Sequence, residues 1–297
     1  MAKRRKKPYE EYLDYLKGLR IVKIVRSSFQ MLCASWELVA LAALADFIFL
    51  VLFSVATTFL QLRAFDHLYQ LLMLVGYQTG GVITQMQDPL GNGLAALSAN
   101  PAFNFHLKQV LYHMFLLFVV LFILWCIFEG LAWWTSHKIR KKRMRVKEAP
   151  LKAYYPSFVV ASAFFFVITL GLIAWALTKY VEAGLNVGSV FSKDFVFGVY
   201  IAALVLVWYF GFISYALTEE NHLRRIWKSI YIGAKKIKVM LPTILFLAVL
   251  YFLLLELWTL LLNLTNNYVS FAFGLLIFIP SITFSRVLFI QAAERLK

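Results

Sequence analysis

Five ionisable residues lie inside or at the edges of long apolar segments, and they are the first candidates for chemistry in this sequence. Asp46 is the deepest, about ten residues into the first apolar segment. Glu256 lies in the outer third of the fifth, while Glu37, Glu129 and Arg286 lie near the cytoplasmic level predicted below. A charged side chain in hydrocarbon costs at least ~2.5 kcal/mol on insertion scales, so such groups are default candidates for function.

Two interpretations stay open for these groups. Glu37, Glu129 and Arg286 are explained by solvation at the interface, or by a Glu–Arg pair that holds helices in register. Asp46 is explained either by a protonated carboxyl hydrogen-bonded to a neighbouring helix or by an ion- or proton-binding group. Because Arg286 lies nearer the cytoplasmic level, we do not expect it to pair directly with Asp46.

A second set of polar residues lies at the predicted outer face and offers metal-ligand chemistry. It consists of Asp66, His67, Asp88, His106 and His113. His106 and His113 are seven residues apart rather than four, and the set matches no compact ligand motif. We therefore predict solvated histidines, no metal site and no cofactor.

Other catalytic patterns are missing from the sequence. It contains no phosphate-binding glycine loop and no nucleophile elbow, so we predict no catalytic residue. Cys33 precedes the first apolar segment and Cys126 lies inside the second, which indicates no disulfide framework and a packing role for Cys126.

The elements that must position these residues are six apolar segments. Each is long enough to cross a hydrocarbon core of ~30 Å as a helix. Hydrophobic residues make up 62% of the chain, and the apolar runs lack the alternation of barrel strands. We predict an all-α polytopic membrane protein with six transmembrane helices, at about 36–62, 109–134, 156–178, 195–217, 241–262 and 270–290.

Positive charge alternates between the connectors. The N-terminal segment, the second and fourth connectors and the C-terminal tail carry 25 Lys and Arg, against 4 in the other connectors. The positive-inside rule then places both termini in the cytoplasm of a cell-membrane protein. We divide the chain into a basic amphipathic segment (1–35), a membrane domain (36–290) with an exofacial interfacial segment at about 64–105, and a cytoplasmic tail (291–297).

A basic amphipathic elbow precedes the fifth predicted span. Leu223, Ile226, Trp227 and Ile230 share one face of a helix over about 222–240, and basic residues lie mainly elsewhere. This composition is typical of helices that lie on anionic leaflets. We predict lipid head-group contacts for Arg224, Arg225, Lys228, Lys235 and Lys236. The +15 net charge is thus assigned to anionic lipid partners rather than to nucleic acid.

The elbow at 222–242, which leads into Pro242, and the six-span plan resemble the membrane domain attached to some glycerophosphodiester phosphodiesterases. They also resemble several uncharacterised six-span prokaryotic membrane families. The resemblance is architectural and covers most of the chain, and it implies no site residue and no activity.

Three functional hypotheses follow from the sequence. The preferred one is a non-catalytic membrane scaffold or lipid-interacting component, with membrane proteins as possible partners in a complex. The alternative is a small-solute or ion transporter that uses Asp46 and Glu256. The third is a membrane-embedded lipid-modifying enzyme.

Overall fold

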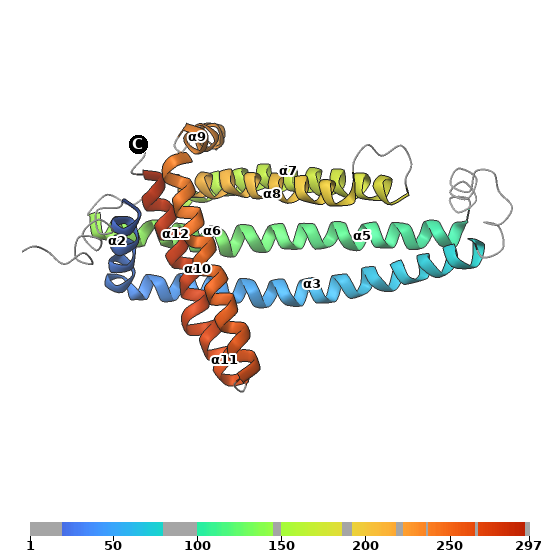
Figure 1. Ribbon diagram of the computed structural model, residues 1–297, viewed down its shortest axis with the longest axis horizontal. Coiled ribbons are helices and arrows are strands. Elements are labelled where there is room, and N and C mark those ends of the chain that lie inside the picture. Colours follow the sequence, from blue (N-terminus) through green and yellow to red (C-terminus); the bar gives the residue numbers. More distant parts are fainter. Residues whose placement is uncertain are drawn as a thin grey trace, which may run out of the picture. The chain divides into compact units, whose positions relative to one another are not determined.

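The computed structural model of the chain describes residues 20–79, 100–144, 150–185, 192–217, 222–235, 237–264 and 267–294, and these residues contain no β-strand. Helices account for nearly all of them (Figure 1). They are α2 (Arg20–Ala34), α3 (Trp36–Thr79), α5 (Pro101–Leu124), the π-helical turn η1 (Trp125–Glu129), α6 (Gly130–Met144), α7 (Leu151–Leu185), α8 (Lys193–Ala216), α9 (His222–Lys235), α10 (Ile237–Leu264), α11 (Asn267–Phe273), the π-helical turn η2 (Gly274–Phe278) and α12 (Ile279–Glu294).

Six of the described helical segments are long and apolar enough to cross a membrane, which confirms the all-α, multi-span prediction. They run over Trp36–Leu74, Pro101–Arg140, Leu151–Tyr180, Lys193–Ala216, Met240–Leu264 and Tyr268–Ala293. Each coincides with one of the six predicted spans. The chain is therefore compatible with a multi-pass membrane protein.

The chain divides into two compact units. The larger, which we call the bundle unit, combines Met1–Phe47 with Cys126–Lys297, and the smaller, the hairpin unit, is Ile48–Trp125. The helix α3 begins in the bundle unit and continues into the hairpin unit, and the segment formed by α5, η1 and α6 returns from one to the other. Each unit is described by itself.

The centre of the bundle unit is α12. It packs against α2, α6, α8, α10 and the turn η2 that precedes it. Half of the most apolar window in the sixth span is buried, against 6–28% of the corresponding windows in the other five. At the low end of this range, α10 exposes large apolar side chains such as Leu253, Leu257 and Leu260, as a lipid-facing helix would.

A second part of the bundle unit is formed by α7, α8 and α9, which all pack against one another. In Figure 1, α7 and α8 run side by side across the view while α9 is seen nearly end-on, so α9 lies crosswise to them. A Cβ added at Gly233 would meet the ring of Phe210 at 2.7 Å, so only glycine permits this close approach of α9 to α8. The hydroxyl of Tyr209 donates to the carbonyl of Gly233 at 2.8 Å and fixes the crossing.

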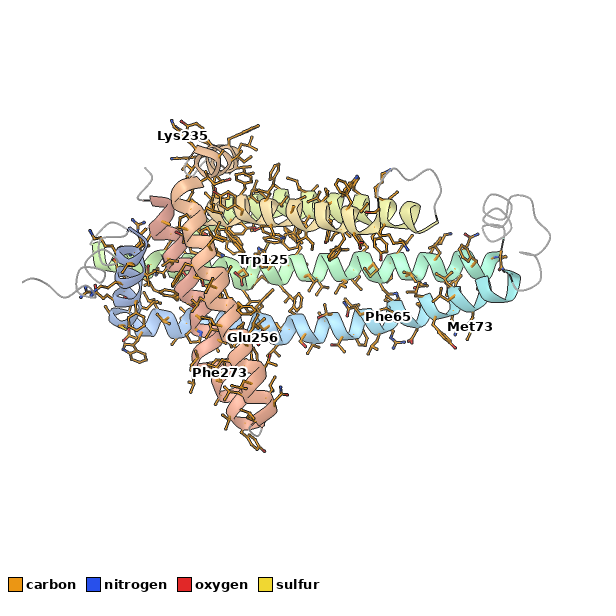
Figure 2. All side chains as sticks on the ribbon, viewed as in Figure 1. Phe65, Met73, Trp125, Lys235, Glu256 and Phe273 are labelled. Atoms are coloured by element: carbon orange, nitrogen blue, oxygen red, sulfur yellow. The ribbon has the colours of Figure 1, made fainter. Side chains whose placement is uncertain are left out.

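In the hairpin unit, α3 and α5 run antiparallel. The rings of Phe49 and Trp125 meet at one end, and those of His67 and His106 meet farther along. Figure 2 labels Phe65 and Met73 on α3, and both side chains are exposed.

The predicted exofacial segment at 64–105 differs from the structure. Residues 64–79 continue α3 without a break, residues 80–99 lie outside the described residues, and α5 begins at Pro101. The physical reason is that Gly76 alone costs a helix only ~1 kcal/mol, which the surrounding leucines outweigh. The resulting helix has 44 residues. At 1.5 Å per residue its length is about 66 Å, twice the thickness of the hydrocarbon core.

Prolines lie at the start of one helix and inside two others. Pro101 is the first residue of α5, and the side chain of Asn100 caps that helix by accepting from Ala102 N at 2.9 Å. By contrast, α7 begins at Leu151 and α10 at Ile237, so Pro156 and Pro242 are each the sixth residue of their helix. The third and fifth predicted spans, which begin at about 156 and 241, therefore start about one turn after the helices that contain them.

Candidate functional site

Three ionisable residues from distant parts of the chain meet in the bundle unit and form one ion-pair network. Arg286 on α12 donates to both carboxylate oxygens of Asp46 on α3, from Nη1 at 2.7 Å and from Nη2 at 2.6 Å. Its Nη2 also donates to both oxygens of Glu129 at 2.8 Å. The side chains of Arg286, Asp46 and Glu129 are only 4%, 2% and 10% exposed. We call these three residues the Arg286 network.

The position of Glu129 depends on an irregularity of its helix. Glu129 is the last residue of η1, where the α-helical pattern widens by one residue for a turn. Turns of this kind re-aim the side chains that follow and are frequent at functional sites. Next in the chain is Gly130, where an added Cβ would meet the ring of Tyr155 at 3.0 Å, so the glycine allows α7 to approach the network closely.

The network corrects one prediction and confirms another. The expectation that Arg286 would not pair with Asp46 is wrong, and the Glu–Arg pair between Glu129 and Arg286 is confirmed. Our sixth predicted span ended at residue 290, whereas α12 continues to Glu294. Arg286 therefore lies about 12 Å from the end of α12, and Asp46 lies about 15 Å from the start of α3, at 1.5 Å per residue. These similar depths permit the pair.

The Arg286 network holds two carboxylates against one guanidinium. Charge-assisted, bidentate contacts of this type have both strength and directional specificity. If both acids are ionised, the network carries one excess negative charge, which a proton could neutralise. The arrangement can therefore do two things: tie α3, η1 and α12 together, or hold and release a proton.

A second buried arginine, Arg225 on α9, caps the end of α8. The helix α8 ends because Leu217 adopts an extended backbone, so the carbonyls of its last turn need partners other than the α-helical ones. The amide of Leu217 donates to the carbonyl of Ser214 at 3.2 Å. Arg225 Nε donates to the carbonyl of Ser214 at 2.6 Å, and its Nη2 donates to that of Tyr215 at 3.1 Å. Its guanidinium also lies over the ring of Tyr154, 4.7 Å from the centroid.

Two further donors meet at the carbonyl of Tyr215. The hydroxyl of Tyr154 donates from α7 at 3.0 Å, and His137 Nε2 donates from α6, also at 3.0 Å. The last turn of α8 is thereby joined to α6, α7 and α9. A cation is favourable at this position because the carboxyl end of a helix is its negative pole. We call Arg225, Tyr154, His137 and the carbonyls of Ser214 and Tyr215 the Arg225 cap.

The Arg225 cap corrects one predicted lipid contact. Arg225 is fully buried, so it is not available to head groups. The sequence pattern did not separate it from its neighbour Arg224, which is exposed. Arg225 is buried because the carbonyls at the end of α8 attract its guanidinium. The amphipathic pattern alone predicts that both arginines face solvent.

The predicted apolar face of α9 is divided in the structure. Ile226 is buried against the bundle unit, whereas Leu223 and Trp227 are 68% and 71% exposed. With the exposed Tyr231 they form an outward apolar stripe at four-residue spacing. We call Leu223, Trp227 and Tyr231 the α9 stripe.

Three cations accompany the α9 stripe. Arg224 and Lys235 are exposed, and Lys228 is half-buried. Figure 2 labels Lys235 on α9. Lys235 Nζ donates to the hydroxyl of Tyr231 at 2.7 Å, and this hydrogen bond raises the pKa of Lys235, so the lysine stays cationic through the physiological range. The predicted contact Lys236 lies outside the described residues.

The remaining candidates do not join either cluster. Glu37 is exposed in the first turn of α3, as solvation at an interface would require. Glu256, labelled in Figure 2, is exposed on α10 among apolar side chains. The structure therefore does not bring Glu256 together with Asp46. Cys126 is buried, and Cys33 is exposed.

The hairpin unit brings three histidines together. His67 Nδ1 and His106 Nδ1 are 3.0 Å apart, and the ring of His113 stacks on that of His67 with centroids 5.6 Å apart. The sequence predicted solvated histidines and gave no sign of this contact, in which all three side chains are half-buried. Their partner in the predicted set, Asp88, lies outside the described residues. Among the described residues no group of three or more His, Cys, Asp or Glu is arranged to hold a metal ion.

Residue spacing carries no signal for the Arg286 network, since its members come from helices far apart in the sequence. The Arg225 cap joins residues 10 and 11 positions apart, but they form no recognisable motif. The only available hint was the rarity of charge within apolar segments, which identified Asp46, Glu129 and Arg286 but not their pairing. Comparisons of the chain with protein-family models, with curated proteins and with solved structures found no match.

Proposed function

We propose that this chain is a non-catalytic membrane scaffold that interacts with lipid, with both termini in the cytoplasm. The observation that carries the proposal is the closure of the Arg286 network. Its three side chains are 2–10% exposed and bond to one another. A transport site must be accessible to the ion that it carries. A cluster that only holds helices together needs no such access, and its buried charges are stabilised by pairing with one another.

The α9 stripe and its cations support the lipid-interacting part of the proposal. A helix that exposes Leu223, Trp227 and Tyr231 beside Arg224 and Lys235 has the composition of an interfacial helix. Its crosswise position on α7 and α8 would hold it parallel to a membrane that those helices cross (Figure 1). Each cation near an anionic surface contributes about 1 kcal/mol.

Proton flux in vesicles tests the scaffold against a transporter. Purified protein reconstituted with an internal pH dye should give no flux above empty vesicles under an imposed pH gradient. Asp46→Asn should leave this baseline unchanged. Flux in the wild type that Asp46→Asn abolishes would reject the scaffold.

The second candidate function, an ion or proton transporter, is favoured by one observation. Asp46 and Glu129 share one guanidinium, which leaves one carboxylate in excess. Such a group is a possible proton-binding site inside a membrane. Because Glu256 lies apart from the network, this candidate depends on Asp46 and Glu129.

The lipid contact can be tested in lipid nanodiscs. The melting temperature of the wild type should be higher in discs that contain anionic lipid than in neutral discs. The variant Arg224→Gln/Lys228→Gln/Lys235→Gln should lose most of this difference, and added salt should reduce it in the wild type. A matched control, Lys108→Gln/Lys179→Gln/Lys193→Gln, removes three cations from the predicted outer connectors and should keep it. Equal losses in both triple variants would contradict a specific role for α9.

Impermeant thiol labelling tests the proposed orientation. In a variant that lacks Cys33 and Cys126, new cysteines at positions 92 and 186 should react in intact cells, and one at position 144 should be protected. This expectation rests on the 25-to-4 distribution of cations. Labelling at 144 from outside would overturn it.

A further inference from the structure

We infer that His67 and His106 form a two-histidine chelate for a divalent transition-metal ion at the junction of α3 and α5 in the hairpin unit. The inference is independent of the scaffold proposal. It starts from the Nδ1 atoms of the two imidazoles, which face each other at 3.0 Å across the two helices. The histidines are 39 positions apart in the sequence, so the antiparallel pairing of α3 with α5 creates the arrangement.

The separation of the two nitrogens suits one shared ion. Zn–N distances of 2.0–2.1 Å in a tetrahedral site correspond to nitrogen atoms about 3.3 Å apart. The observed pair must therefore open by only about 0.3 Å. Both side chains are half-buried, so an ion can reach them while the helices hold the rings in place.

Metal binding requires only a change of tautomer in one of the two imidazoles, and neither ring gains or loses a net proton. In the metal-free pair one Nδ1 carries a hydrogen that it donates to the lone pair of the other. When an ion binds, the donor imidazole transfers this proton to its own Nε2 by exchange with solvent, so both Nδ1 lone pairs face the ion. Both rings stay neutral throughout, and the charge of the ion is the only charge added.

His113 provides support beside the pair. Its ring stacks on His67 with an interplanar angle of 30°, and its Nδ1 lies 2.7 Å from the carbonyl of Gln109. Donation to that carbonyl fixes the tautomer that leaves Nε2 with a free lone pair, the arrangement that second-shell contacts give to metal-binding histidines. Because the described residues hold no ready group of three ligands, water completes the coordination shell.

Charged groups of both signs act on His67. The carboxylate of Asp66 and the guanidinium of Arg63 both act electrostatically on His67. Arg63 itself lies over the ring of Phe59, 5.7 Å from its centroid. Imidazole ligands with water favour Cu²⁺, Zn²⁺ and Ni²⁺ over Mg²⁺ and Ca²⁺, which prefer oxygen.

Titration of the full-length, detergent-purified protein with metal ions alone tests the site. Zn²⁺ and Cu²⁺ should bind with one ion per chain, raise the melting temperature and be reversed by chelator, while Mg²⁺ and Ca²⁺ should have no effect. His67→Gln and His106→Gln should each weaken Zn²⁺ binding at least tenfold. His222→Gln, which changes a histidine of the bundle unit, should leave binding unchanged.

Wild-type protein gives a readout that needs no variant. In the presence of dissolved oxygen, Cu²⁺ with ascorbate as the reductant oxidises the side chains that ligate the copper, so mass spectrometry should find His67 and His106 oxidised ahead of the other histidines. The site is overturned by absence of Zn²⁺ and Cu²⁺ binding, by binding that both variants retain, or by oxidation confined to other residues.

Discussion

Two buried arginines in the bundle unit are neutralised in different ways. Arg286 contacts carboxylates of residues 240 and 157 positions away, from α3 and η1. Arg225 contacts backbone carbonyls only 11 and 10 positions away, at the end of α8. The Arg286 network joins helices that are far apart in the sequence. The Arg225 cap instead stabilises the turn between α8 and α9, which follow each other in the chain. A buried cation therefore fixes the arrangement of distant helices when its partners are side chains, and the direction of the chain when its partner is a helix end.

The largest expected effect is the loss of Arg286. Arg286→Met leaves Asp46 and Glu129 buried without a cation, and breaking a buried pair in this way costs about 3–5 kcal/mol. Thermal unfolding in detergent, followed by tryptophan fluorescence, should show a large fall in the melting temperature or no folded protein. Arg286→Lys, which keeps the charge but loses the bidentate geometry, should recover part of the loss. A melting temperature equal to that of the wild type would mean that the network does not hold the bundle unit.

Loss of one carboxylate should cost less than loss of the shared cation. Asp46→Asn leaves Arg286 paired with Glu129 and removes the excess negative charge, so only the charge-assisted bonds are lost, about 1.5–3 kcal/mol. Asp46→Leu removes the polar group altogether and should be worse. The order Asp46→Asn, Asp46→Leu, Arg286→Met in increasing damage can be measured in one series of melting curves. An Asp46→Asn variant less stable than Asp46→Leu would show that a polar side chain at position 46 does not stabilise the network.

Loss of the Arg225 side chain should act locally. Arg225→Met leaves the carbonyl of Ser214 without its guanidinium donor, while that of Tyr215 keeps Tyr154 and His137. The carbonyl of Ser214 still accepts from the amide of Leu217 at 3.2 Å. The cost is therefore the loss of charged donors, about 1.5 kcal/mol. Limited trypsin digestion should cut the chain near α9 faster than in the wild type. Accelerated cleavage near α2 instead would mean that Arg225 stabilises the whole bundle unit and not only the end of α8.

The smallest effect is expected at Tyr154. Tyr154→Phe removes one of three donors to the same carbonyl and keeps the ring under Arg225, so the loss should be about 0.5–1.5 kcal/mol. The double variant with Arg225→Met should lose more than the sum of the two single variants, because the carbonyl of Tyr215 is then left with His137 alone. Simple additivity in this double-mutant cycle would indicate independent sites.

Several features of the fold could be predicted because they depend on local composition. Apolar length located all six candidate spans, and α8 was placed to within two residues of its observed ends. The continuation of α3 past residue 62 was not predicted, since Gly76 and the glutamines weaken the apolar signal without ending the helix. The starts of α7 and α10 were missed because a proline is tolerated one turn into a helix that packing supports.

The candidate sites show the same division between features that depend on local composition and features that depend on packing. From the sequence it was clear that Asp46, Glu129 and Arg286 needed an explanation, because charge within an apolar segment is costly wherever that segment packs. The packing of the helices sets the contacts: the three residues meet, Arg225 is buried while Arg224 is exposed, and His67 faces His106. Such contacts depend on the rotation and axial position of each helix against its neighbours, and these are properties of packing that no single segment encodes.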